Sequence, residues 1–217
     1  MNRRTDLLVG ISMALVVIGV SLTGLLFRWP WMFSLIAWLM VALYLVYIGI
    51  SRNPLFLRLL VFALACNLPQ LLTDFYHARV VRTLIYDYSL FKVLDTPDYI
   101  VAGWGFAFLQ LGYLFLRLRP RLGTGLTTAL ITAGGTLVHS WYEEMAYQAH
   151  AWRYLDARMI GHVSLWVILS FALIIATICL LLAWLERRKH LAWWALGGVL
   201  NGIGIFTYSA LAVALLR

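Results

Sequence analysis

The sequence has few charged residues and few cysteines. Of its 217 residues, 12% are charged and 63% are hydrophobic, whereas about 25% of the residues in a typical soluble domain are charged. These proportions exclude a soluble globular domain and are typical of a membrane protein. Both cysteines, Cys66 and Cys179, lie inside apolar segments, which argues against a disulfide framework and against a cysteine-based zinc site.

Other missing features narrow the range of functions. The last apolar segment, 191–216, has no lysine for a retinal Schiff base, so a rhodopsin is not expected. The five histidines are fewer than membrane di-iron desaturases carry, and none of them forms the His-x-x-x-His pair of seven-helix zinc lipid hydrolases. We find no internal repeat of the sort that many transporters have, so a transporter ranks below an enzyme.

The net charge of +8 comes mostly from Lys and Arg at the ends of apolar segments. Membrane topology accounts for basic residues at such positions, so nucleic-acid binding is not expected. Ten of the 17 basic residues fall on the side of the N-terminus and seven on the other side. The positive-inside rule therefore predicts a cytoplasmic N-terminus and an extracytoplasmic C-terminus. The first apolar run is long and lacks an obvious cleavage site, so we expect a retained helix.

Seven apolar segments are long enough to cross a membrane, since a helical span needs about 20 apolar residues. They begin near Leu7, Trp31, Leu55, Tyr99, Gly123, His162 and Leu191. Only the connections 80–97 and 148–160 are sizeable. We therefore expect an all-α, multi-pass protein of the cell membrane, with seven transmembrane helices forming a single domain over residues 1–217.

Two strings of polar residues run through the third and fifth of these segments. Their spacings of three and four residues place each string on one helical face. The first string is Asn67, Gln70, Asp74 and His77, and the second is Thr136, His139, Glu143, Tyr147 and His150. An ionisable group at membrane depth costs about 2.5 to 3.5 kcal/mol on insertion scales. Two aligned strings therefore indicate an internal polar site, which this topology places toward the extracytoplasmic face.

Several of these residues also fit a structural role. The amide side chains fit hydrogen bonds that only hold the helices together. Asp74 and His77 fit a structural pair bound to a nearby arginine. Glu144 follows Glu143 and points about 100° away from it on the helix, where it can pair with an arginine near the headgroups.

The residue types at the site favour acid chemistry on a hydrophobic substrate. A carboxyl group beside a histidine in a partly dry pocket can act as a general acid. Aromatic walls can stabilise a carbocation through their ring quadrupoles. We predict that the substrate is bound by a further set of polar and aromatic residues, namely Asn67, Gln70, Trp104, Gln110, Trp141, Tyr147, His150, Asn201 and Tyr208.

Two short stretches resemble known membrane enzymes. Tyr142-Glu143-Glu144, the aromatic stretch through Trp152 and Tyr154, and the segment 161–166 (Gly-His-Val-Ser-Leu-Trp) together resemble the carotenoid hydratase and membrane lycopene cyclase group. The string 66–70 (Cys-Asn-Leu-Pro-Gln) is similar to the Asn-x-x-Trp-Glu helix of integral-membrane terpene cyclases. It departs from that motif, because proline replaces the tryptophan and glutamine replaces the acid.

The resemblance implies acid-initiated cyclisation, hydration or isomerisation of an isoprenoid, with no metal cofactor. It implies a catalytic group formed by Asp74, His77, His139, Glu143 and Glu144. Within that group either Asp74 or Glu143 supplies the proton. The two histidines tune or relay it.

Two other functions remain open at this point. The first is a metal-dependent lipid hydrolase, with zinc or iron bound by His77, His139, His150 and Glu143. The second is a non-enzymatic pigment- or lipid-binding subunit, in a homo-oligomer or a larger membrane complex, in which His77 or His139 binds the metal of a haem or chlorin.

Overall fold

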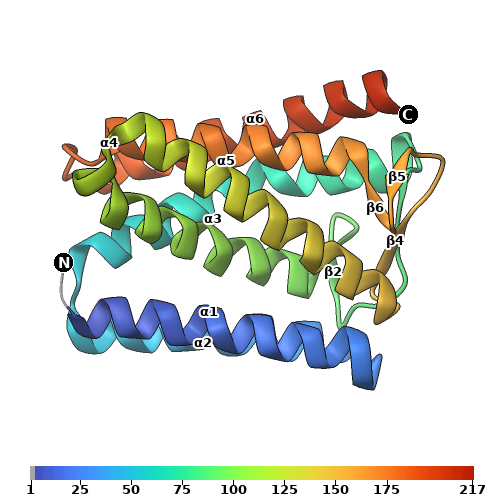
Figure 1. The fold of residues 1–217 in the computed structure, drawn as a ribbon, viewed down its shortest axis with the longest axis horizontal. Coiled ribbons are helices and arrows are strands. Elements are labelled where there is room, and N and C mark those ends of the chain that lie inside the picture. The colour runs from blue at the N-terminus through green and yellow to red at the C-terminus, as the bar shows by residue number, and fades with distance from the viewer. Residues whose placement is uncertain (1–2) are drawn as a thin grey trace.

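Six helices within residues 3–217, the part of the chain that the structure describes, are long and apolar enough to cross a membrane. The computed structural model is 80% helical, and its helices run side by side with the two termini at opposite ends (Figure 1). Two of the helices, α1 and α3, are continued by π-helical turns, η1 and η2. The elements are α1 (Arg3–Leu22), η1 (Thr23–Phe27), α2 (Trp31–Ser51), α3 (Pro54–Phe75), η2 (Tyr76–Val80), α4 (Asp98–Gln148), α5 (Leu165–Leu185) and α6 (Leu191–Leu216).

The seven expected segments correspond to six elements, because the fourth and fifth both lie in α4. A straight helix of the 51 residues of α4 would be about 76 Å long, more than twice the ~30 Å of a bilayer core. Instead α4 turns back at Gly123, whose φ of 75° and ψ of 166° are not helical. We call residues 98–122 the N-terminal arm of α4 and residues 124–148 its C-terminal arm.

The two arms of α4 pack against each other (Figure 1). The ring centroids of Trp104 and His139 lie 6.2 Å apart across the arms. Further along, a Cβ atom on Gly135 would come within 3.3 Å of Leu111. Glycine allows this close approach, so the reversal at Gly123 brings the second polar string beside the N-terminal arm.

Sequence signals at helix ends explain where α3 and α6 begin. Asn53 precedes α3, and its Oδ1 accepts hydrogen bonds from the backbone N–H groups of Leu55 and Phe56 at 3.0 and 3.4 Å. Pro54 follows as the first helical residue, a position where proline loses no hydrogen bond. His190 caps α6 in the same way, since its Nδ1 accepts from the N–H of Ala192 at 3.2 Å.

The two sizeable connections contain short strands, which the expectation of an all-α fold did not include. They form three antiparallel pairs, β1 with β4, β2 with β3, and β5 with β6, at the end of the bundle where the C-terminus lies (Figure 1). The strands are β1 (Leu84–Tyr86), β2 (Lys92–Val93), β3 (Thr96–Pro97), β4 (Trp152–Tyr154), β5 (Met159–Ile160) and β6 (Val163–Ser164). Runs of two or three residues show too little alternation to be recognised from the sequence.

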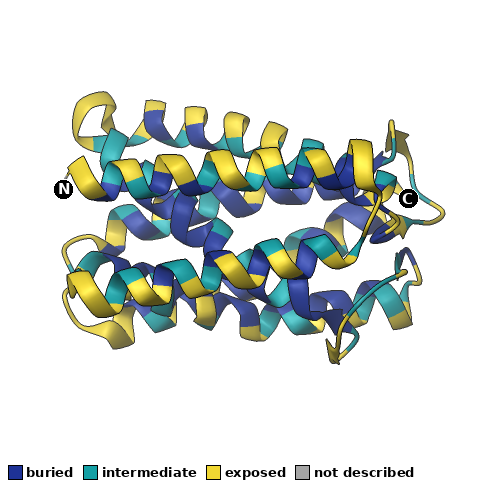
Figure 2. Ribbon diagram, turned by 90° about the horizontal axis from the view of Figure 1, so that it is seen from below, coloured by how far each residue is buried: buried dark blue, intermediate teal, exposed yellow. Residues whose placement is uncertain are grey.

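Burial fits a bundle surrounded by lipid. The buried positions face inward, whereas the outer faces of the helices are exposed (Figure 2). Many exposed side chains are large and apolar, for example Leu26 at 69% and Ile50 at 81%. Water would penalise such a surface, whereas hydrocarbon chains solvate it. The fold therefore supports a membrane protein made of apolar helices.

Replacing Gly123 with alanine should destabilise the reversal of α4. An L-residue at this φ and ψ costs about 1 to 3 kcal/mol, so we expect thermal unfolding in detergent to occur at lower temperature in G123A. Gly125 is the matched control, because it lies in helical backbone and its Cβ would also meet open space. G125A should leave stability unchanged or raise it slightly, and an equal loss in both variants would contradict this account.

Candidate functional site

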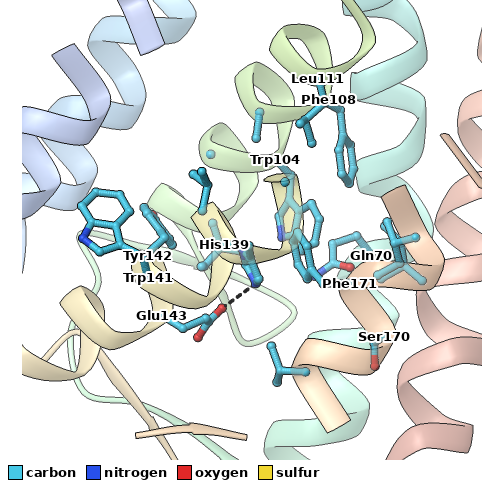
Figure 3. Close-up of a pocket in the computed structure, with 18 of the residues that line it drawn as sticks. Gln70, Trp104, Phe108, Leu111, His139, Trp141, Tyr142, Glu143, Ser170 and Phe171 are labelled. Atoms are coloured by element: carbon cyan, nitrogen blue, oxygen red, sulfur yellow. Dashed lines mark ion pairs between the residues drawn. The ribbon is translucent and has the colours of Figure 1, made fainter. Parts of the chain in front are cut away.

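A cavity of about 390 Å³ lies inside the bundle. Its walls come from α1, α3, both arms of α4, α5 and α6, and β1 and β4 cover one end. Figure 3 shows His139 and Glu143 on the C-terminal arm of α4, joined by a dashed line that marks their ion pair, and His139 stacks on Phe171 of α5. The cavity therefore joins the two polar strings that the sequence predicted.

Glu143 is buried and has partners on both carboxylate oxygens. Its Oε2 accepts hydrogen bonds from the Trp152 indole N–H at 2.6 Å and from the Tyr154 hydroxyl at 2.7 Å. Its Oε1 lies 2.9 Å from the Nε2 of His139, one helical turn earlier (Figure 3). Tryptophan can only donate, so this set of partners suits an ionised carboxylate.

His139 is fixed by aromatic rings. It stacks on Phe171 and lies beside Trp104. Its Nε2 is close enough to Glu143 for an ion pair, but the ring is not aligned for a directed hydrogen bond. Attraction between charges would therefore join the two groups when the imidazole is protonated.

Asp74 has a different environment. Its Oδ1 accepts hydrogen bonds from the Gln70 amide at 3.2 Å and from the Tyr86 hydroxyl at 3.0 Å. Its Oδ2 is buried and meets no aligned hydrogen-bond donor within residues 3–217, although the Thr96 hydroxyl lies near the carboxyl group. A buried oxygen without a donor is costly as part of an anion, so Oδ2 is the site in this cavity best suited to carry a proton.

His77 lies one turn beyond Asp74, in η2. Its ring stacks on Trp166 at a centroid distance of 4.2 Å, and its Nδ1 lies 3.1 Å from the Thr83 hydroxyl. Its Nε2 is buried and has no hydrogen-bond partner in the described part of the chain. One ring nitrogen is thus anchored, and the other is available to a ligand.

The pair β1–β4 supplies the hydroxyl and indole donors to both acids. In its register Tyr86 faces Trp152, and Leu84 faces Tyr154. Alternate side chains of a strand share one face, so these four point toward the cavity that they line, whereas Arg153 points to solvent. Burial and the nearby carboxylates raise the pKa of Tyr86 and Tyr154 well above the usual value, so both remain donors.

Tyr86 is the main residue that sequence reasoning missed. It lies outside the apolar segments and outside both polar strings. Trp152-Arg153-Tyr154 alternates in polarity, whereas Leu84-Ile85-Tyr86 is apolar throughout, so the available signal is the alternation in the later segment. That signal becomes meaningful only once the two connections are known to pair.

Four predicted substrate-binding residues line the cavity, namely Gln70, Trp104, Gln110 and Trp141. Gln110 also holds the bundle together, because its amide donates to Ser12 at 3.2 Å and to Tyr44 at 3.0 Å. Gln110 therefore has, at least in part, the structural role considered for the amide side chains, which is to hold the helices together.

The structure does not bring the other predicted residues to the cavity wall. Asn67 donates to the backbone of Val101, and Asn201 donates to the sulfur of Cys66. Both contacts join neighbouring helices. The hydroxyl of Tyr208 lies 3.0 Å from that of Thr177 on α5.

Glu144, Tyr147 and His150 also lie outside the cavity. Glu144 pairs with His162 rather than with the expected arginine, at 2.7 Å, and Tyr147 stacks on the same imidazole. His150 is exposed and has a φ of 57°. The helix has already ended before this residue, so His150 does not lie on the helical face predicted for it.

The alternative metal site is not assembled by this fold. No group of three or more His, Cys, Asp or Glu side chains within residues 3–217 is placed to bind a metal ion. Of the four predicted ligands, His150 lies away from the cavity that the other three line.

A family model described as "Domain of unknown function (DUF6989)" matches residues 71–216. The chain belongs to the DUF6989 family. No curated protein and no solved structure matches it. The DUF6989 region contains Asp74, His77, His139 and Glu143 but leaves out α1, α2 and most of α3.

Removing the Tyr154 hydroxyl should destabilise the protein. In Y154F one donor to the buried Glu143 is lost, which we expect to cost about 1 to 3 kcal/mol. Y208F removes a hydroxyl that bonds to Thr177 away from the cavity and should cost about 0.6 kcal/mol. Thermal unfolding of both variants in one detergent measures the difference, and equal losses would show that Tyr154 does not support the carboxylate.

Proposed function

We propose that this protein is an integral-membrane enzyme that acts on a hydrophobic isoprenoid or lipid by acid-initiated cyclisation, hydration or isomerisation. The observation that carries the proposal is the difference between two buried carboxyl groups in one cavity. Glu143 has hydrogen-bond donors at Oε2 and the His139 imidazole at Oε1, whereas Oδ2 of Asp74 has no aligned donor in the described part of the chain. Two acids in unequal environments are the arrangement that separates a proton donor from a proton acceptor.

In this mechanism Asp74 protonates the substrate. The proton on Oδ2 moves to one carbon of a double bond, and the neighbouring carbon becomes cationic. Tyr86 and Gln70 donate to Oδ1 and stabilise the aspartate anion that remains. A general acid of this kind contributes about 10² to 10⁴-fold to the rate.

Aromatic rings would stabilise the cation between the two acids. Trp104, Tyr142 and Trp166 are among the aromatic residues that line the cavity. Ring faces attract cations, by about 2 kcal/mol or more when water is excluded. The apolar wall also excludes water. The cation can therefore rearrange before it reacts, unless the enzyme binds a water molecule next to it.

The pair of Glu143 and His139 would end the reaction. Loss of a proton from the cation to this pair gives an isomerised or cyclised alkene. Addition of a water molecule, with its proton passing to the same pair, gives an alcohol. The proton that the pair has gained then returns to Asp74, so that neither acid gains or loses a proton over the whole cycle.

The D74N variant tests the proton donor. Wild-type protein incubated in D2O with an extract of neutral membrane lipids, or with a defined isoprenoid hydrocarbon, should place deuterium on carbon in the product. D74N should lower this incorporation by about 10² to 10⁴-fold. The matched control is D156N, since Asp156 is 79% exposed and lies outside the cavity.

Mass spectrometry of the products gives the readout, and an absorption spectrum of the same sample detects a bound pigment. Unchanged deuterium incorporation in D74N and E143Q, with both variants folded, would refute the mechanism. A stoichiometric pigment without turnover would favour the subunit function instead.

We also propose that the chain crosses the membrane seven times, with α4 crossing twice. The reversal at Gly123 and the length of each arm support two crossings. The excess of basic residues on the N-terminal side supports a cytoplasmic N-terminus. The cavity end that β1 and β4 cover would then face outward.

Cysteine labelling tests this topology. Ser89, in the connection before α4, should react as S89C with a membrane-impermeant maleimide in intact cells. Ser51, at the end of α2, should react as S51C only after permeabilisation. The background is low because both native cysteines are buried, and the reverse pattern would invert the assigned orientation.

A further inference from the structure

The cavity wall is incomplete on the side that faces the bilayer. Val17 of α1 and Leu130 and Val138 of the C-terminal arm of α4 all line the cavity. Their exposed fractions are nevertheless 42%, 50% and 51%. A side chain that borders both an internal cavity and the outer surface marks an opening between them.

The opening lies between two helices that run in the same direction. At one end η1, which continues α1, is in close contact with the C-terminal arm, because a Cβ atom on Gly24 would come within 2.8 Å of the Met145 carbonyl oxygen. Val17 and Val138, each seven residues earlier in the chain, both line the cavity. The two helices separate toward the other end of the bundle (Figure 1).

Gly134 widens this opening. A Cβ atom added there would meet nothing within 4 Å, although Gly134 lines the cavity. The next residue, Gly135, is different, since its Cβ would lie 2.8 Å from Ile175. Gly135 serves close packing against α5, whereas Gly134 borders empty space on the helical face that it shares with Leu130 and Val138.

The cavity contains acids but no permanent cation. Among residues 3–217, no Lys or Arg lines it, although the chain has 17 of them. A phosphate group brought into the cavity would lose its hydration next to Asp74 and Glu143 without a cation to offset the loss. A hydroxyl group or an unsaturated hydrocarbon meets no such penalty.

We propose that an uncharged single-chain lipid enters the cavity sideways from the bilayer, through the opening between α1 and the C-terminal arm of α4. Its reactive part reaches Asp74, and its remaining chain lies along Met13 and Gly134 or extends into the surrounding lipid. A cavity of about 390 Å³ falls within the usual range for small-molecule sites. The inference rests on the proposed function only in treating this cavity as the substrate site.

Photolabelling tests the route without relying on turnover. The probe is a long-chain alcohol with a diazirine in its chain, added to phosphatidylcholine vesicles that contain the full protein. Wild type, G134L and G10L are compared. Gly10 is the matched control, because its Cβ also meets open space but it does not line the cavity.

Adducts are mapped to residues by mass spectrometry. In wild type and G10L, the alcohol should label cavity residues such as Trp104 and Phe171. In G134L the cavity adducts should fall by about tenfold, equivalent to ~1.4 kcal/mol of binding free energy. Adducts on the lipid-facing Leu200 and Ile203 should remain in all three proteins and report that each is folded in the vesicle.

A second probe, the phosphate monoester of the same alcohol, tests the charge preference. It should label the cavity of wild type at least about tenfold less than the alcohol does. Equal cavity labelling of G134L and wild type would overturn the route, and equal or stronger labelling by the phosphate would overturn the lipid class. Cavity labelling without deuterium incorporation would reject the proposed function alone. Turnover that depends on Asp74 and is equal in G134L and G10L would reject the entry route alone.

Discussion

The structure depends on the hydrogen bonds that Trp152 and Tyr154 donate to Glu143. A carboxylate inside a membrane bundle needs donors, and its own helix cannot supply them, since helical N–H groups are already bonded. The connection after α4 therefore turns back and forms β4 over the cavity. The pairing of β4 with β1 then positions Tyr86 above Asp74. One requirement for hydrogen bonding thus fixes the covering strands, the environment of both acids and the closed end of the cavity.

Helical periodicity predicted the centre of the site well. Asp74 and His77 share one face of α3 and η2, and His139 and Glu143 share one face of α4, so these pairs meet as expected. The spacing in the sequence is sufficient to predict that two residues lie together when both belong to one continuous helix. His150 shows where this reasoning stops, because its positive φ takes it off the helical face.

Features that depend on pairing between distant segments were not predictable. The hydrogen bond from the Tyr86 hydroxyl to Asp74 requires β1 to lie beside β4. Glu144 pairs with His162, eighteen residues later, instead of with an arginine. Amides such as Asn67 and Asn201 were ambiguous, because a polar residue on a helical face suits a helix contact as well as a cavity. The joining of two expected segments in α4 was unpredictable for a related reason, since one glycine can reverse a helix without leaving a visible linker.

The single-residue reversal at Gly123 also bears on how the protein enters the membrane. The two arms of α4 are joined at Gly123 without a loop. No connecting segment can therefore stay outside the membrane while one arm inserts before the other. The C-terminal arm carries His139, Glu144 and Glu143, whose hydrogen-bond donors lie on β4, so the arm would be costly to insert alone. The N-terminal arm packs beside it through Trp104 and Leu111. The arms are therefore suited to enter the bilayer together as a helical hairpin, in which one arm shields the polar face of the other before α5 is made.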